Sequence, residues 1–181
     1  MNLANLITLG RLLAVPLAVW LILDARLTEA FFLFLLAGVS DAVDGFIAKR
    51  YDQRTEFGAV LDPLADKALL VSLYVTLGIA QYLPAWLVIL VVFRDVLIVG
   101  GFILAKLLVL PLRFAPLYIS KINTGLQIVL VAYTLARLGL GFGGEALMTV
   151  LVWLTAATTV ASGSAYLVRL GRTIAGMEQG P

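Results

Sequence analysis

Six stretches of about 20 mostly apolar residues follow one another along this chain of 181 residues. A helix that crosses the hydrocarbon core of a bilayer needs about 20 such residues. In this chain 62% of residues are hydrophobic and 13% are charged, whereas a soluble domain averages about half apolar and a quarter charged. The pattern predicts an all-α integral membrane bundle of six transmembrane helices, forming a single membrane-embedded domain over residues 1–181. The expected helices cover residues 5–24, 29–50, 57–80, 84–106, 117–138 and 145–168.

Basic residues are distributed unevenly between the two ends of these helices. Six crossings place both chain termini on one side of the membrane, and cytoplasmic loops carry an excess of Lys and Arg. Near the opposite ends of the helices lie only Arg26 and Arg137. The side with both termini is therefore expected to face the cytoplasm, or the matrix in a mitochondrion, because it holds Lys49, Arg50, Arg54, Lys106, Arg113, Lys121, Arg169 and Arg172.

The residue types that are missing limit the possible chemistry. The sequence has no cysteine and no histidine, which excludes disulfides, thiolate nucleophiles, histidine-dependent triads and the usual zinc sites. A metal site would have only oxygen ligands, and these favour Mg²⁺, Mn²⁺ or Ca²⁺. The net charge of +2 is too small to indicate a nucleic-acid partner.

Four carboxylates lie inside the second and third apolar stretches, at Asp41, Asp44, Asp62 and Asp66. Acidic side chains within a membrane are costly, and they mark ion sites, proton relays or polar cavities. Residues three or four apart share one face of a helix, and a short turn between the two helices would bring the two pairs to face each other. Because four bare carboxylates repel one another unless cations neutralise them, the spacing predicts a divalent-metal site.

The residues around these acids favour phosphoryl transfer. Two metal ions held by carboxylates about 3.5–4 Å apart form the usual clamp for in-line attack at phosphorus. In a chain without histidine, a carboxylate can accept the proton of the attacking hydroxyl. Gly45, Ala48 and Gly58 are small enough to let a flat ligand approach the backbone, and Lys49 adds a cation beside the acids.

Two other classes of membrane protein are compatible with parts of this pattern. A cation transporter could use the four acids as a transit site, but transporters often show repeats and broken helices in both halves. Here the acids lie in one half and no internal repeat is visible. A structural scaffold would leave four intramembrane acids unexplained. We therefore favour an enzyme over either class.

The complete motif resembles the signature of the CDP-alcohol phosphotransferase family. It runs from Asp41 to Asp66 as Asp-x-x-Asp-Gly-x-x-Ala-Lys, eight residues, and Gly-x-x-x-Asp-x-x-x-Asp. The family pattern has Arg at the position of Lys49, so here the charge is kept without the bidentate fork of Arg. Because Arg50 follows directly, either Lys49 or Arg50 can be the residue that contacts phosphate.

The resemblance implies a fold of six membrane helices, usually as a homodimer, and a reaction in which an alcohol displaces CMP from a CDP-linked lipid. It implies that two divalent cations, Mg²⁺ or Mn²⁺, are held by the four motif aspartates, with Asp66 as the base. The nucleotide would then lie near Gly45, Ala48, Lys49 and Gly58.

Secondary stretches are similar to the cardiolipin synthases of this family, of the mitochondrial type also present in some bacteria. They cover residues 61–74, 93–96, 120–124 and 155–162. This similarity implies CDP-diacylglycerol and phosphatidylglycerol as substrates, and a bacterial cytoplasmic membrane or a mitochondrial inner membrane as the location. The alternative within the family is a phosphatidylglycerophosphate synthase, for which glycerol 3-phosphate is the acceptor.

Four residues outside the acidic motif are candidates for binding the acceptor: Arg94, Arg113, Lys121 and Asn123. A phosphodiester lipid needs a single cation, whereas a free terminal phosphate would need a denser cationic pocket. Arg94 and Asp95 can equally form a structural ion pair that locks helices together. Adjacent residues of a helix do not face each other, so each of the two is expected to need a partner from another helix.

Overall fold

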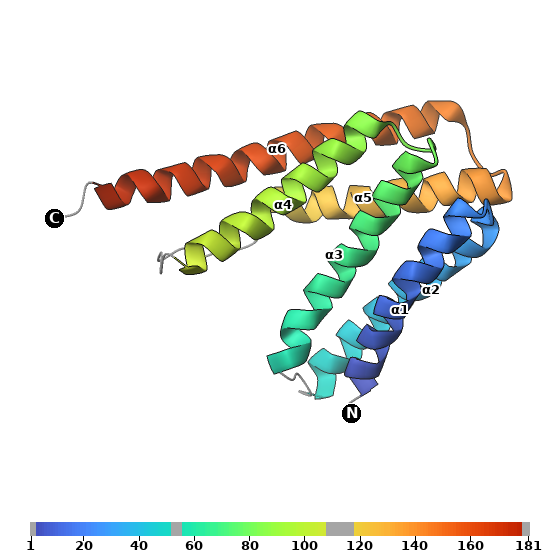
Figure 1. Cartoon of the computed structure of the whole chain (residues 1–181), viewed down its shortest axis with the longest axis horizontal. Coiled ribbons are helices and arrows are strands. Elements are labelled where there is room, and N and C mark those ends of the chain that lie inside the picture. The colour runs from blue at the N-terminus through green and yellow to red at the C-terminus, as the bar shows by residue number, and fades with distance from the viewer. Residues whose placement is uncertain (1–2, 52–55, 108–117, 179–181) are drawn as a thin grey trace. The chain divides into compact units, whose positions relative to one another are not determined.

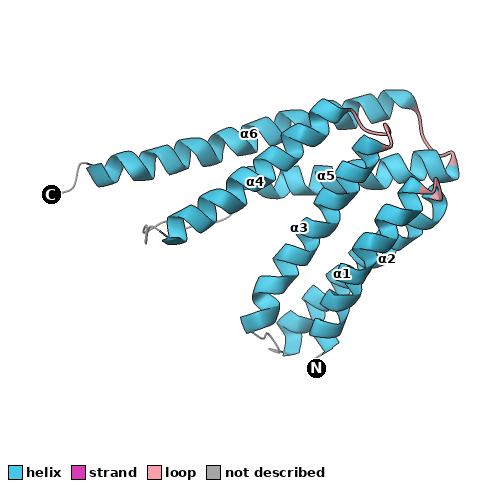
Figure 2. Ribbon diagram, in the orientation of Figure 1, coloured by secondary structure: helices cyan, strands magenta, loops and turns pink. Residues whose placement is uncertain are grey.

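The computed structural model describes the backbone of residues 3–51, 56–107 and 118–178, and the side chains of residues 10, 12–40, 67–101, 118–169 and 171 within them. The described backbone is all-α and contains no strand (Figure 2). Its six helices are α1 (Leu3–Leu23), α2 (Leu27–Tyr51), α3 (Glu56–Ile79), α4 (Ala85–Leu107), α5 (Tyr118–Leu140) and α6 (Glu145–Glu178) (Figure 1). The all-α prediction is confirmed, and the largest difference from it is that α6 continues to Glu178 instead of ending near residue 168.

Two helices of the described residues are long and apolar enough to cross a membrane, Tyr118–Leu140 and Glu145–Arg169. Shorter apolar segments cover Leu12–Leu23, Leu27–Ser40 and Lys67–Ile79. Crossing of the membrane by all six helices therefore stays a prediction.

Large apolar side chains are exposed on every helix of the described part. Exposure is 65% for Leu13, 66% for Leu36, 69% for Ile89 and 64% for Trp153. In water such a surface would be an aggregation hazard, whereas a bilayer solvates it. Buried polar side chains accompany it, including Arg94, Asn123 and Gln127. This distribution of polar and apolar side chains suits a protein surrounded by lipid.

The chain divides into two compact units, which are described separately. Unit 1 comprises Met1–Pro84 and Val131–Met148, and unit 2 comprises Ala85–Leu130 and Thr149–Pro181. Helices α5 and α6 each contribute residues to both units. The expectation of one domain over residues 1–181 stays a prediction.

In unit 1, α1 packs against both α2 and α3. The start of α1, the end of α2 and the start of α3 lie at the same end of this unit in Figure 1. In a bilayer, where lipid tails are as apolar as these side chains, close van der Waals packing is a main stabilising contribution to such contacts. The core contains the buried residues Ala18, Leu21, Ile22, Ala30, Phe34, Leu73, Tyr74, Leu77, Val131 and Leu135.

Helices α1 and α3 end close to the positions expected from the sequence. Each is followed by a residue with a left-handed backbone conformation. Ala25 has a φ of 57° and Gln81 has a φ of 61°. The next backbone N–H folds back onto the helix in each case, from Arg26 to the carbonyl of Leu21 at 2.8 Å and from Tyr82 to the carbonyl of Leu77 at 2.8 Å. These bonds satisfy carbonyl groups that the helix end leaves open. They give α1 and α3 defined ends.

A close helix contact in unit 1 joins α5 to the start of α2. The Thr28 hydroxyl donates a hydrogen bond to the Gly139 carbonyl at 2.6 Å. A Cβ atom on Gly139 would lie only 2.6 Å from the backbone nitrogen of Thr28. Glycine is therefore required at this position, because the contact is with backbone that cannot move aside.

Candidate functional site

The acidic motif lies on α2 and α3 of unit 1. The backbone is helical at Asp41 and Asp44 in α2, and at Asp62 and Asp66 in α3. The i,i+3 and i,i+4 spacings therefore place each pair of positions on one face of its helix, as predicted. Residue Tyr51 ends α2 and Glu56 begins α3, so the connection between the two helices is short.

The side chains of the motif lie outside the described residues. This applies to the predicted metal ligands and base, and to the predicted nucleotide-binding residues Gly45, Ala48, Lys49 and Gly58. Their roles stay predictions. Among the side chains that the structure describes, no group of three or more acidic, histidine or cysteine residues is placed to hold a metal ion.

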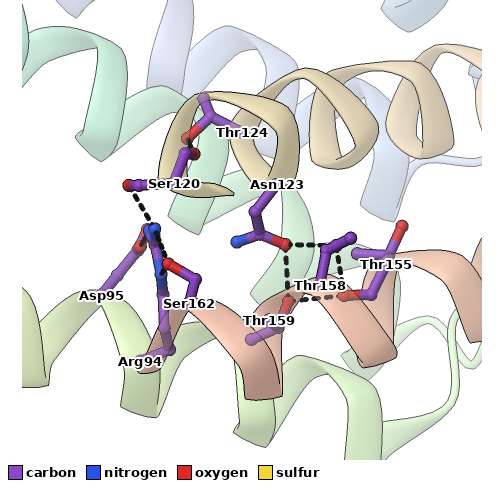
Figure 3. Close-up of polar contacts among 9 residues, drawn as sticks. All are labelled: Arg94, Asp95, Ser120, Asn123, Thr124, Thr155, Thr158, Thr159 and Ser162. Atoms are coloured by element: carbon purple, nitrogen blue, oxygen red, sulfur yellow. Dashed lines mark hydrogen bonds and ion pairs between the residues drawn. The ribbon is translucent and has the colours of Figure 1, made fainter. Parts of the chain in front are cut away.

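Unit 2 contains a buried polar cluster that joins α4, α5 and α6 (Figure 3). At its centre is Arg94 of α4, which is 3% exposed. The guanidinium donates from Nε and Nη2 to the Ser162 hydroxyl of α6, at 3.1 and 2.6 Å, and from Nη2 also to the Ser120 hydroxyl of α5. Its Nη1 donates to Asp95 Oδ1 at 2.6 Å. Four of the five N–H groups of an arginine are thereby used.

The pairing of Arg94 with Asp95 corrects one sequence-based expectation. The two residues are adjacent, yet they form an ion pair at 2.6 Å with both side chains at most 5% exposed. The rule that neighbours do not face each other concerns the directions of the Cβ atoms. The arginine side chain is long enough to bend toward the carboxylate of the next residue. The expected partners on other helices are present for Arg94, since Ser120 and Ser162 supply them.

Asn123 of α5 is the centre of a second set of contacts in unit 2. Its side chain is fully buried. The amide Oδ1 accepts hydrogen bonds from the hydroxyls of Thr158 and Thr159 on α6, each at 2.9 Å. Figure 3 shows the amide nitrogen on the opposite side of the Asn123 side chain from both threonines. Within the described part of the chain this nitrogen is buried and has no hydrogen-bond partner.

The structure places the other predicted acceptor-binding residues differently. Lys121 lies on α5 and is exposed, whereas Asn123 two residues later is buried. Arg113 lies outside the described residues. Of the four predicted residues, the structure thus describes Arg94 and Asn123 in buried polar surroundings on α4 and α5 of unit 2.

Sequence reasoning did not assign roles to the serine and threonine residues that hold these two side chains. Ser162 has no pairing signal with Arg94, from which it is 68 residues distant. A weaker signal was present within each helix. Polar residues recur every three or four positions in otherwise apolar stretches, at Ser120, Asn123 and Gln127 in α5 and at Thr155, Thr159 and Ser162 in α6. Such spacing indicates a polar face shared between helices.

Comparison with known proteins identifies the family of this chain and several of its relatives. Residues 1–161 match the family model described as CDP-alcohol phosphatidyltransferase. The chain is 34% identical to a cardiolipin synthase (CMP-forming) of Rattus norvegicus over 178 residues, which cover 90% of this chain and 59% of the rat protein. It is 36% identical to the chloroplastic CDP-diacylglycerol–glycerol-3-phosphate 3-phosphatidyltransferase 1 of Oryza sativa over 189 residues, 93% of this chain and 57% of the rice protein.

A bacterial relative matches over more of its own length. A probable phosphatidylglycerophosphate synthase of Mycobacterium tuberculosis is 32% identical over 187 residues, which cover 98% of this chain and 86% of that protein. The chain spans less than two thirds of the length of the rat and rice relatives.

Proposed function

Because the chain belongs to the CDP-alcohol phosphatidyltransferase family, we propose that it is a cardiolipin synthase. It transfers a phosphatidyl group from CDP-diacylglycerol to phosphatidylglycerol and releases CMP. The observation that carries this proposal is the similarity, over 90% of the chain, to proteins named cardiolipin synthase (CMP-forming). The rice and mycobacterial relatives favour a second candidate, a phosphatidylglycerophosphate synthase that uses glycerol 3-phosphate.

Divalent cations are general to this family, and the donor set fits them. Asp41, Asp44, Asp62 and Asp66 offer only carboxylate oxygens, which Mg²⁺ and Mn²⁺ prefer. We propose that these four residues hold two such ions. When bound, the ions supply positive charge to the phosphoryl oxygens on which negative charge develops.

The remaining motif residues act on the donor lipid and on the proton. Asp66 accepts the proton of the acceptor hydroxyl, whose oxygen forms a bond to the phosphorus attached to diacylglycerol. The bond from this phosphorus to the oxygen of CMP breaks, and CMP leaves. Gly45, Ala48 and Gly58 give the nucleotide close access to the backbone. Lys49, or its neighbour Arg50, binds a phosphate of the CDP group.

The acceptor is bound by residues outside the motif, for which we propose Arg94, Arg113, Lys121 and Asn123. The Arg94 cluster supports a phosphodiester acceptor over a free phosphate. The charge of Arg94 is already offset by Asp95, and four of its five N–H groups have partners. One remaining N–H suits a single phosphodiester charge better than a dianionic terminal phosphate, which normally draws several charged donors.

In this proposal the protein is a homodimer. All six helices of each chain cross a bacterial cytoplasmic membrane or a mitochondrial inner membrane. The acidic motif lies on the cytoplasmic or matrix side. The exposed apolar side chains of every helix support a bilayer as the surroundings. The excess of basic residues at one set of helix ends supports the sidedness.

The acceptor is tested by CMP release from CDP-diacylglycerol, with purified protein in detergent micelles and Mg²⁺ or Mn²⁺ present. We expect turnover with phosphatidylglycerol to exceed turnover with glycerol 3-phosphate by at least about tenfold, within the range of discrimination by a binding pocket. Omission of the acceptor controls for hydrolysis of the donor. A ratio in the opposite direction would establish the phosphatidylglycerophosphate synthase instead. Absence of CMP with both acceptors, together with Mn²⁺ uptake into vesicles, would indicate a transporter.

Replacement of Lys49 by Ala is expected to raise the KM for CDP-diacylglycerol by about 10-fold or more, with kcat nearly unchanged. A hydrogen bond to a charged group contributes about 1.5–3 kcal/mol, and loss of uniform substrate binding appears in KM. Lys49→Arg should restore affinity, and Arg50→Ala serves as the neighbouring control. An unchanged KM in Lys49→Ala with a raised KM in Arg50→Ala would move the phosphate contact to Arg50.

A further inference from the structure

Lys67 of α3 carries its charge inside the protein. Its Nζ atom is buried, while the side chain as a whole is only half-buried. A lysine of a membrane helix usually does the reverse, with its stem against apolar surroundings and its ammonium extended toward water. The other two cations whose side chains the structure describes in unit 1 differ from it, since Arg26 is exposed and Arg137 lies in the last turn of α5.

The backbone places Lys67 at the depth of the acidic motif in unit 1. Lys67 directly follows Asp66, and it lies eleven residues after the start of α3 at Glu56. Asp41 lies ten residues before the end of α2 at Tyr51. At about 1.5 Å per residue, both positions are about 15–17 Å from the helix ends that the short connection joins. A buried ammonium therefore belongs to the same level of unit 1 as the deepest acids of the motif.

Charges at this separation act on one another. The Cα atoms of adjacent residues are about 3.8 Å apart, so the charged groups of Asp66 and Lys67 stay close, and salt screens buried charges only weakly. The ion pair of Arg94 and Asp95 in unit 2, at 2.6 Å, shows that a long cationic side chain can reach the carboxylate of the adjacent residue. A cation beside four carboxylates reduces their mutual repulsion, and it repels a metal ion that binds to them.

We infer that Lys67 is a fixed counter-charge of the acidic motif, which stabilises the metal-free protein and raises the metal concentration needed to fill the site. This inference rests on the proposed function, in which the four motif aspartates hold two divalent cations. The ammonium and the metal ions offset the same negative charge, so each reduces the stabilisation that the other provides. Lys67 is a positioning residue in this role, because it acts through the aspartates and not on the substrate.

Binding of Mn²⁺ and thermal unfolding of the purified full chain in detergent test this role. Lys67→Met keeps a side chain of similar length and removes its charge. We expect the Kd for Mn²⁺, measured by electron paramagnetic resonance of the free ion, to fall by at least about tenfold, because a nearby charge changes a charge equilibrium by about one to three powers of ten. Without metal the variant should melt several degrees below the wild type, and saturating Mn²⁺ should narrow this difference.

Two further variants control for the charge and for its position. Lys67→Arg keeps the positive charge and should bind Mn²⁺ like the wild type. Arg26→Gln removes one cation from the same unit, just after the end of α1, where Arg26 pairs with the exposed Glu29 at 2.9 Å. It should leave the Kd for Mn²⁺ unchanged, and any change in its melting temperature should be the same with and without metal.

A second measurement needs no metal. In an Asp66→Asn background one carboxylate of the motif is already neutral, so Lys67→Met should lower the metal-free melting temperature less in that background than in the wild-type chain. If Lys67→Met can be purified only with Mn²⁺ present, the double variant should be recovered without it. Equal effects of Lys67→Met in both backgrounds would contradict the inference.

The inference is also overturned if Lys67→Met binds Mn²⁺ no more tightly than the wild type, or if it is destabilised equally with and without metal. Either result would mean that Lys67 only packs against its neighbours. Tighter Mn²⁺ binding by Lys67→Arg would exclude the charge as the cause.

The proposed function has separate readouts. If the wild-type chain binds no Mn²⁺, the metal assignment is wrong, and the comparison of metal-free variants still decides the role of Lys67. If the chain binds Mn²⁺ but releases CMP only with glycerol 3-phosphate, the choice of acceptor is wrong and the inference on Lys67 is unaffected.

Discussion

Asp62→Asn is expected to abolish CMP release, with a loss of at least about 10³-fold in kcat/KM. The substitution removes one negative charge and one strong oxygen ligand from the four-carboxylate motif on α2 and α3. A metal ion contributes several kcal/mol of transition-state stabilisation in phosphoryl transfer, and each 1.36 kcal/mol corresponds to a factor of ten in rate. The Asp41→Asn and Asp44→Asn variants should show the same loss.

The same variants should bind Mn²⁺ more weakly, which can be followed by electron paramagnetic resonance of the free ion. Asp24→Asn is the matched control, since Asp24 is an exposed carboxylate at the end of α1, outside the motif. It should keep full activity and Mn²⁺ binding. Normal turnover by Asp62→Asn, in a variant that elutes and melts like the wild type, would show that the metal assignment is wrong.

The helices could be predicted because the residues that end each helix lie next to it in the sequence. Apolar stretches of membrane length end at residues 24–26 and 81–84, where the structure places left-handed residues at Ala25 and Gln81. The end of α6 was not predicted. Arg169 and Arg172 were expected to lie beyond the helix, but arginine is a good helix former, and no proline lies between Glu145 and Pro181. The helix therefore continues beyond the apolar stretch to Glu178.

The candidate site was predictable only where its residues lie close together in sequence. The four aspartates follow helical spacing within 26 residues, so the sequence alone shows which of them share a face of a helix. Arg94 and Ser162 instead meet across 68 residues, and Asn123 and Thr159 across 36. Which polar residues of three apolar helices meet depends on how the helices pack and rotate, and hydrophobic periodicity does not fix that rotation when apolar residues cover all sides of a helix.

Asp66→Asn is expected to lower kcat by about 10²–10⁴-fold, the contribution of a positioned general base, while the affinity for CDP-diacylglycerol changes only a few-fold. Asp66 lies one helical turn after Asp62 on α3, and as the base it accepts the proton of the acceptor hydroxyl. The loss of kcat should persist when Mn²⁺ is saturating, because it comes from the missing proton transfer.

Saturation with Mn²⁺ separates a base from a residue that only holds metal. Asp62→Asn should lose Mn²⁺ affinity and activity together, whereas the kcat of Asp66→Asn should stay low even when Mn²⁺ is saturating. Glu56→Gln, a carboxylate change at the start of the same helix, should keep the wild-type kcat. If Asp66→Asn retains more than about a tenth of the wild-type kcat, the loss is smaller than the smallest effect of a general base. The proton would then pass to another group. The other motif carboxylates, Asp41, Asp44 and Asp62, would then be the candidates for the base.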